Sequence, residues 1–258
     1  MPEPVDYDRV APDYDRRYDG IRFPGIEEAL AAFAGAPTGL RCLEVGCGTG
    51  FWLDLLRGLG ASVAGLEPSH EMLARAGARV PAATLRKGTA DRLPWDDGAF
   101  DRVFCVNAVH HFPDVPAFFA EARRVLGPGG GLMVVGLDPS SGVDRWFVYD
   151  FFEGALDADV RRYPTTSTVE QWLAKAGFAA CGTAVAHHMD MRIPARLALD
   201  GGMLVKNVVS QLSLLDEAVY EAGIARIRAR IERAESTGDS FFLDTDLRFY
   251  ATTAWVPG

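Results

Sequence analysis

The sequence has few cysteines, no long apolar run and no surplus of positive charge. Its cysteines are Cys42, Cys47, Cys105 and Cys181. They form neither a C-x-x-C pair nor a Cys/His cluster, which excludes the usual spacings of a protein metal site. No apolar run approaches the roughly 18 residues that cross a bilayer, and the acidic, polar start of the chain is unlike a secretory leader. We therefore expect a cytoplasmic protein with no bound metal and no membrane partner.

Acidic residues outnumber basic ones, and the formal net charge of the 258 residues is −9. A polyanion such as DNA is repelled by such a chain unless a local basic patch offsets the charge. The most basic-looking stretch, Ile224 to Arg233, alternates charged and apolar residues, which is typical of an amphipathic surface helix. The composition therefore favours a small-molecule partner and no nucleic acid.

Short apolar runs alternate with helical patterns in the first half of the chain. The strand-like runs cover residues 39–45, 61–67, 82–88, 100–109 and 131–138. The helical patterns cover 51–60, 69–80 and 115–126. Ser69 is in position to cap the second helix. Strands that alternate with helices indicate βαβ units, so we expect an α/β fold with a doubly wound, mostly parallel sheet.

The second half of the chain has a different pattern, with an aromatic segment and long helical stretches. In order, we expect helix over 144–164, helix over 167–177 and strand over 179–187. A long helical stretch over roughly 194–236, interrupted near Gly201 and Gly202, and a strand over 241–256 should follow. We expect a single domain over 1–258. Within it, residues 139–165 and 190–238 are expected to be helical cap insertions.

The stretch "EVGCGTGF", which starts at Glu44, places three glycines directly after the first strand-like run. Glycine permits a tight turn and lets the backbone approach a bound ligand closely. A phosphate-binding loop is excluded because no lysine follows these glycines. A nicotinamide or flavin dinucleotide site would need glycine where Phe51 stands. The stretch matches throughout the E-x-G-x-G-x-G turn of S-adenosylmethionine-dependent methyltransferases.

Acidic residues follow two later strand-like runs. Glu67 ends the second run, where a carboxylate can accept hydrogen bonds from ribose hydroxyls. Asp91 follows the third run, where it can accept from an adenine amino group while the Ala90 backbone approaches the ring. With the glycine turn, these motifs make residues 40–137 resemble a class I S-adenosylmethionine-dependent methyltransferase. The resemblance is to the small-molecule group that contains the ubiquinone and menaquinone biosynthetic enzymes.

The resemblance implies a seven-stranded sheet whose last strand is antiparallel, with S-adenosylmethionine as the cofactor. It also implies that residues 1–25 form an N-terminal lid. The implied cofactor-binding residues are Glu44, Gly46, Cys47, Gly48, Gly50, Glu67, Pro68, Met72, Ala90, Asp91, Asn107 and Ala108, with Tyr14 and Tyr18 from the lid. Met72 can pack on the adenine, or it can equally belong to the core of its helix.

Methyl transfer from a sulfonium to a small-molecule acceptor is an in-line displacement, so the enzyme mainly has to align the acceptor. A base is needed only where the acceptor loses a proton. His110 and His111 follow the fourth strand-like run and are the candidates for that base, although they can instead orient the loop. Trp146, Tyr149 and Phe152 are candidates for an apolar acceptor pocket, unless they form the core of a cap helix. The acceptor atom stays open among oxygen, nitrogen, carbon and sulfur.

Two other functions compete with methyl transfer. A cofactor-binding module would keep the same motifs without turnover. An NAD-dependent oxidoreductase would use the same fold, and the residue at position 51 argues against it. Within the methyltransferases, "NAVH" stands where enzymes that methylate base amino groups carry N-P-P-Y or D-P-P-Y, which argues against a nucleobase acceptor.

Overall fold

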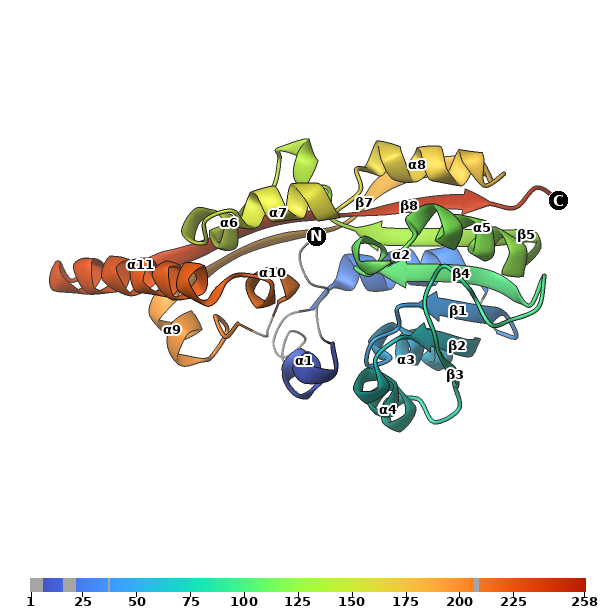
Figure 1. Ribbon diagram of the computed structural model, residues 1–258, viewed down its shortest axis with the longest axis horizontal. Coiled ribbons are helices and arrows are strands. Elements are labelled where there is room, and N and C mark those ends of the chain that lie inside the picture. The colour runs from blue at the N-terminus through green and yellow to red at the C-terminus, as the bar shows by residue number, and fades with distance from the viewer. Residues whose placement is uncertain (1–6, 16–21, 37, 207–208) are drawn as a thin grey trace. The chain divides into compact units, whose positions relative to one another are not determined.

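The computed structural model describes residues 7–15, 22–36, 38–206 and 209–258 (Figure 1). The chain divides into two compact units. Unit 1 comprises Met1–Arg22, Pro139–Arg162 and His188–Arg248. Unit 2 comprises Phe23–Asp138, Tyr163–His187 and Phe249–Gly258. Most of the residues expected in cap insertions belong to unit 1.

From β3 to β8, the sheet has the strand order β3-β2-β1-β4-β5-β8. Neighbouring strands from β3 to β5 are parallel, whereas β8 is antiparallel to β5. The strands are β1 (Arg41–Val45), β2 (Ser62–Glu67), β3 (Thr84–Lys87), β4 (Phe100–Val106), β5 (Leu126–Gly136) and β8 (Phe242–Trp255). The strand order reverses between β1 and β4, and doubly wound sheets bind ligands at the carboxyl ends of the strands beside such a reversal.

The predicted α/β fold with a mostly parallel sheet and an antiparallel last strand is confirmed. Strand β7 (Ala179–Pro194) pairs with β8 and completes the seven expected strands. A two-residue strand, β6 (Arg145–Trp146), also pairs with β8 in antiparallel fashion. Within the described residues the sheet therefore has eight strands.

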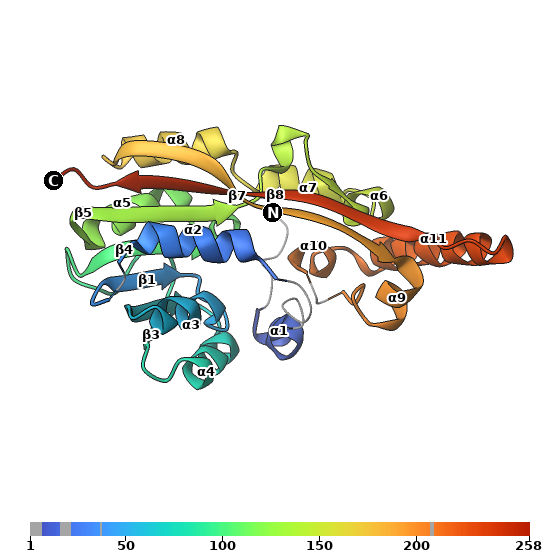
Figure 2. The same cartoon turned by 180° about the vertical axis from the view of Figure 1, so that it is seen from behind.

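Helices cover both faces of the sheet in unit 2. Figures 1 and 2 view the sheet from opposite sides, with α5 in front in the first and α2 in front in the second. The helices are α2 (Pro24–Ala34), α3 (Phe51–Gly58), α4 (His70–Arg79), α5 (Val115–Val125) and α8 (Thr166–Lys175), with the 3₁₀ helix η2 (Val109–His111). The predicted cap of α4 is confirmed, because Ser69 Oγ accepts a hydrogen bond from the Met72 amide at 3.1 Å.

The core of unit 2 forms where the apolar faces of these helices meet the sheet. Phe118 and Phe119 of α5 are fully buried, as are Leu43 of β1 and Leu132 of β5. Strands β1, β2 and β4 read as nearly continuous apolar runs because parallel strands covered on both faces expose neither side to water. Strand β3, at the edge, is mostly exposed.

Unit 1 is mainly helical in its described residues. Its helices are α1 (Tyr7–Tyr14), η3 (Pro139–Ser141), α6 (Phe147–Phe151), α7 (Ala155–Arg162), α9 (Ala195–Asp200), α10 (Ser210–Ser213) and α11 (Glu217–Ser236). The continuous helix expected over 144–164 is wrong, because residues 145–146 form strand β6 and the helical part is divided into α6 and α7. Helix α11 packs closely on Phe152, because a Cβ on Gly223 would collide with that ring.

Strand β7 is longer than the sequence predicts. We expected it to end at residue 187, but it continues to Pro194, so residues 190–194 are strand and not helix. The extension pairs with β8, where His188 Nε2 lies 2.7 Å from Asp246 Oδ1. The partner lies far along the chain, so no local pattern could have indicated the extension.

None of the described helices combines the length and the apolar character that crossing a bilayer requires.

Candidate functional site

The glycine turn joins the end of β1 to the start of α3. Gly46, Gly48 and Gly50 have φ angles of 76°, 50° and 79°, in the left-handed region that side chains disfavour. A Cβ placed on Gly46 would lie only 2.7 Å from the Cβ of Ala108, which follows β4. Glycine is therefore required at this position both by backbone conformation and by the close approach of two loops.

Glu67, at the end of β2, holds the glycine turn. Its two carboxylate oxygens accept hydrogen bonds from the amides of Gly48 and Ser69, each at 3.1 Å. The turn is also tied to β2 through the amides of Gly46 and Cys47, which donate to the Leu66 carbonyl. Glu67 therefore joins the end of β2 to both the glycine turn and the start of α4.

Glu44 lies in β1 beneath the turn and is 1% exposed. Its Oε2 has no hydrogen-bond partner among the described residues. Burial raises the pKa of this carboxyl well above its ordinary value, and the nearby charge of Glu67 raises it further. A ligand that brings an N–H donor or a positive charge would satisfy this oxygen.

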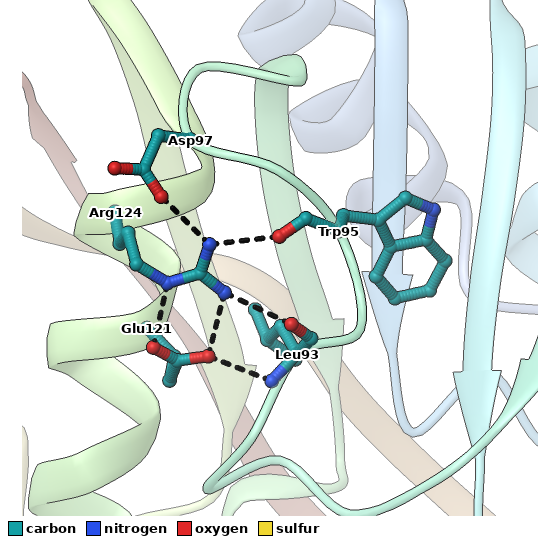
Figure 3. Close-up of polar contacts among 5 residues, drawn as sticks. All are labelled: Leu93, Trp95, Asp97, Glu121 and Arg124. Carbon is teal, nitrogen blue, oxygen red and sulfur yellow. Dashed lines mark hydrogen bonds and ion pairs between the residues drawn. The ribbon is translucent and has the colours of Figure 1, made fainter.

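The loop after β3 is fixed to helix α5 by a network around Arg124 (Figure 3). Its guanidinium donates to the carbonyls of Leu93 and Trp95 at 2.9 and 2.7 Å, and to Asp97 Oδ1 at 2.9 Å. It also donates twice to Glu121, whose carboxylate accepts the Leu93 amide. The sequence did not reveal this network, because its residues come from two segments that look like an ordinary loop and an ordinary surface helix.

The same loop carries the predicted adenine residues. Ala90 is buried, and Asp91 is half-buried with no partner for its Oδ1 in the part of the chain that the structure describes. Across the strand reversal, Asn107 follows β4 with a positive φ of 50°, and its amide donates to the Val135 carbonyl. The Oδ1 of Asn107 is likewise without a partner among the described residues.

The two candidate bases form the 3₁₀ turn after β4. The rings of His110 and His111 lie 4.0 Å apart between centroids. His110 stacks on Tyr163, with centroids 3.8 Å apart and planes 23° from parallel. Tyr163 precedes α8 and was not anticipated, because nothing near it in the sequence indicates contact with the fourth strand.

Asp138, just beyond β5, is a further buried group that sequence reasoning missed. It is 6% exposed, and its Oδ2 accepts hydrogen bonds from the amide and the hydroxyl of Thr166 at 2.9 and 3.2 Å. Its Oδ1 has no partner within the described ranges. The available signal was its place at the end of an apolar strand-like run, the same signal that identified Glu67.

Other predicted site residues occupy varied surroundings. In unit 2, Pro68 is exposed, Cys47 is buried and Met72 has no exposed surface. Tyr14 belongs to unit 1, where it packs edge-on against Tyr7, and Tyr18 lies outside the described residues. The aromatic candidates of the acceptor pocket, Trp146, Tyr149 and Phe152, all belong to unit 1.

The three aromatic candidates have partners within unit 1. Tyr149 Oη donates to Asp159 at 2.9 Å, and Trp146 packs edge-on against Tyr149. Phe152 is fully buried and stacks on Tyr220 of α11. The described residues contain no group of three or more His, Cys, Asp or Glu side chains that could hold a metal ion.

Comparisons with known proteins find methyltransferases. The family model of the methyltransferase domain matches residues 43–134. The phthiotriol/phenolphthiotriol dimycocerosates methyltransferase of Mycobacterium leprae is 33% identical over 180 residues, covering 68% of this chain and 64% of that protein. Sterol 24-C-methyltransferase ERG6B of Gibberella zeae is 28% identical over 180 residues, covering 64% of this chain and 45% of that protein. The matches thus span less than two thirds of the length of these relatives.

A solved structure shares the fold. Phosphoethanolamine N-methyltransferase 2 of Haemonchus contortus, in complex with S-adenosyl-L-methionine, has a TM-score of 0.62 and 18% identity. The match covers 97% of this chain and 57% of that chain. At this identity the likeness concerns the fold alone.

The groups at the strand ends fit S-adenosylmethionine. Glu44, Asp91 and Asn107 each present a buried acceptor oxygen without a partner among the described residues, so a fitting ligand supplies donors and not phosphate oxygens. S-adenosylmethionine carries an ammonium, ribose hydroxyls, an adenine amino group and a cationic sulfur. The matched domain, the fold and this acceptor-rich edge identify the chain as a member of the class I S-adenosylmethionine-dependent methyltransferase family.

Proposed function

We propose that this protein transfers a methyl group from S-adenosylmethionine to a small-molecule acceptor. The observation that carries the proposal is a set of acceptor oxygens on Glu44, Asp91 and Asn107 that have no partner in the described part of the chain. They accompany a glycine turn that contains no lysine. A phosphate-bearing ligand would face repulsion here, whereas a cationic, donor-rich ligand gains partners.

The proposed cofactor contacts follow from the position of each group in unit 2. Gly46 and Gly48 let the backbone approach the methionine end, and the Glu44 carboxylate holds the ammonium. Glu67 accepts from the ribose hydroxyls, and Asp91 accepts from the adenine amino group. Asn107 and Ala108 flank the sulfur. Gly50 lies with the other two glycines near the methionine end, Met72 packs on the adenine, and Cys47 and Pro68 are further residues of the cofactor site.

The bound cofactor supplies an electrophilic methyl group on sulfur. The residues of the chain align the acceptor behind that methyl and exclude water, and such alignment is worth roughly 7–11 kcal/mol in favourable cases. Where the acceptor carries a proton, His110 or His111 takes it onto an imidazole nitrogen, which can accept a proton near neutral pH. Both follow β4 at the same edge of the sheet as the glycine turn.

A small acceptor is favoured over nucleic acid. The net charge of −9 repels a polyanion, and both curated relatives are named for small-molecule acceptors. The narrower resemblance to the ubiquinone and menaquinone enzymes remains part of the proposal. So do the contributions of Tyr14, Tyr18, Trp146, Tyr149 and Phe152, and the lid and cap roles predicted for their segments.

Calorimetric titration with S-adenosylmethionine and with NAD tests the cofactor assignment. We expect the first to bind and the second not to bind, and we expect Glu67→Ala and Asp91→Ala each to weaken binding while the unfolding transition is retained. Unchanged affinity in both variants would remove the site assignment. An acceptor screen with methyl-labelled S-adenosylmethionine then tests turnover, and cofactor binding without release of S-adenosylhomocysteine on any acceptor would favour the binding-module alternative.

A further inference from the structure

We propose that the Asp138 carboxylate binds the methyl acceptor, through a hydroxyl or amine hydrogen that the acceptor donates to Oδ1. This inference rests on the proposed methyl transfer and adds a substrate class to it. The class comprises acceptors with an O–H or N–H donor near the reacting atom. The carboxylate disfavours acceptors that present a carboxylate or phosphate at that place.

The topology of the sheet brings Asp138 to the edge that carries the predicted site. Strands β4 and β5 are parallel neighbours, with Val106 opposite Val135. The segments that follow these two residues therefore leave the sheet side by side. The first segment contains His110, the candidate base, and the second contains Asp138.

A short stretch before α8 links the same two side chains. Tyr163 stacks on the His110 ring at 3.8 Å, and Thr166, at the start of α8, donates through its amide and its hydroxyl to Asp138. Tyr163 and Thr166 are three positions apart, so their Cα atoms lie within roughly 11 Å of each other. The imidazole contacts the first of these residues and the carboxylate contacts the second, and all four residues belong to unit 2. This neighbourhood combines a proton acceptor, an aromatic face and a hydrogen-bond acceptor.

The two oxygens of Asp138 have different surroundings. Oδ2 accepts both hydrogen bonds from Thr166 and thereby holds the first turn of α8. Oδ1 is buried and has no partner among the described residues. A buried acceptor without a partner costs free energy. The structural role of Asp138 needs only Oδ2, so it does not explain why Oδ1 stays unpaired.

The charge of Asp138 defines what its partner should be. Both of its hydrogen-bond donors belong to Thr166 and are neutral. A buried carboxylate in such surroundings is stabilised by an added donor, and most strongly by a protonated amine. An anionic group at the same place would be repelled. The donor class therefore follows from charge as well as from hydrogen bonding.

Asp138→Asn separates the two roles of the side chain. Its amide keeps the size of the carboxylate and can still accept from Thr166 through oxygen, while its NH₂ group replaces Oδ1 and opposes a donor on the ligand. Asp114→Asn is the matched control. Asp114 caps α5 by accepting the Ala117 amide at 3.0 Å, it is exposed, and asparagine caps helices equally well.

The probes are phenol, benzylamine, anisole and benzoate, titrated by ligand-observed NMR onto the full chain with and without S-adenosylhomocysteine. We expect phenol or benzylamine to bind at least fivefold more tightly than anisole and benzoate in the wild type and in Asp114→Asn. We expect this preference to fall below twofold in Asp138→Asn, with a thermal unfolding transition still present.

The inference is overturned if anisole binds as tightly as both donor probes, if none of the four binds, or if Asp138→Asn keeps the preference. If Asp138→Asn shows no unfolding transition, Asp138→Glu is measured in its place. This variant keeps the carboxylate and should keep the donor preference. Absence of S-adenosylhomocysteine binding in the wild type would count against the proposed function instead, because the titrations without that ligand still measure the preference.

Discussion

Arg124 and Glu121 form a two-bond ion pair on α5, with Nε and Nη2 of the arginine 2.8 and 2.7 Å from the two glutamate oxygens. The pair lies one turn apart on the helix, and each partner also holds the backbone of Leu93 in the loop after β3 (Figure 3). The arginine holds the pKa of Glu121 below its ordinary value, with its hydrogen bond the largest cause. The pair therefore anchors the loop that carries the predicted adenine residues.

Replacing Arg124 by lysine should loosen that loop. Lysine has no planar guanidinium that can donate hydrogen bonds to Glu121 and to two carbonyls at the same time. Because the two side chains are 32% and 20% exposed, we expect a modest stability loss of about 1–2 kcal/mol together with weaker binding of S-adenosylmethionine. Urea unfolding and calorimetry measure the two effects. Arg57→Lys, which alters an exposed pair with Asp54, should change neither, and equal effects of the two substitutions would contradict the anchoring role.

Gly46→Ala should destabilise the chain more than an alanine at an open glycine. The substitution adds the strain of a positive φ and a 2.7 Å approach to the Ala108 Cβ, which the backbone fixes in place. We expect a loss of about 2–5 kcal/mol. Gly129 has a similar φ of 69° and nothing within 4 Å of its Cβ position, so Gly129→Ala should cost about 1–2 kcal/mol. Chemical denaturation of both variants measures the difference, and equal losses would mean that the contact of the two loops is not tight.

Glu44 should make stability depend on pH. Its pKa is raised in the folded chain, so the folded state retains a proton that the unfolded state has released. The resulting contribution is fully present below the ordinary glutamate pKa of 4.5 and is lost as pH rises through the folded pKa. The free energy of unfolding should therefore fall with pH over this range, and Glu44→Gln should remove that part of the slope. Glu28→Gln, at an exposed position of α2, should keep it, and a wild-type slope in Glu44→Gln would refute the assignment.

The four cysteines, all of which lie in described parts of the chain, should differ in reactivity. Cys42, Cys47 and Cys105 are buried and Cys181 is exposed. Burial raises the pKa of Cys42 to about 11 and raises the pKa of Cys47 well above its ordinary value. We expect one thiol to react rapidly with a disulfide reagent in the native protein and the others only after unfolding. Cys181→Ser should abolish the rapid phase, and rapid reaction of this variant would show that a buried thiol becomes accessible.

The local signals in the sequence were strong around the first strand crossovers. The glycine turn, the Ser69 cap and the acid at the end of β2 are each specified by residues within a few positions of one another. The class of ligand could be predicted for the same reason. The absence of a lysine after the glycines excluded a phosphate-binding loop, and Phe51 argued against a dinucleotide site. The prediction of the fold succeeded because buried parallel strands and amphipathic helices have different apolar periods.

By itself, then, the sequence determined the alternation of the first five strands with helices, the glycine turn at Gly46 and the Ser69 cap. Only the tertiary structure decided that Tyr163 lies on His110, that Thr166 holds Asp138 and that β7 extends to Pro194. Each of these contacts joins residues far apart in the chain. Side chains that meet through the packing of separate elements leave no periodic pattern in either segment, whereas turns and caps are encoded by the residues that form them.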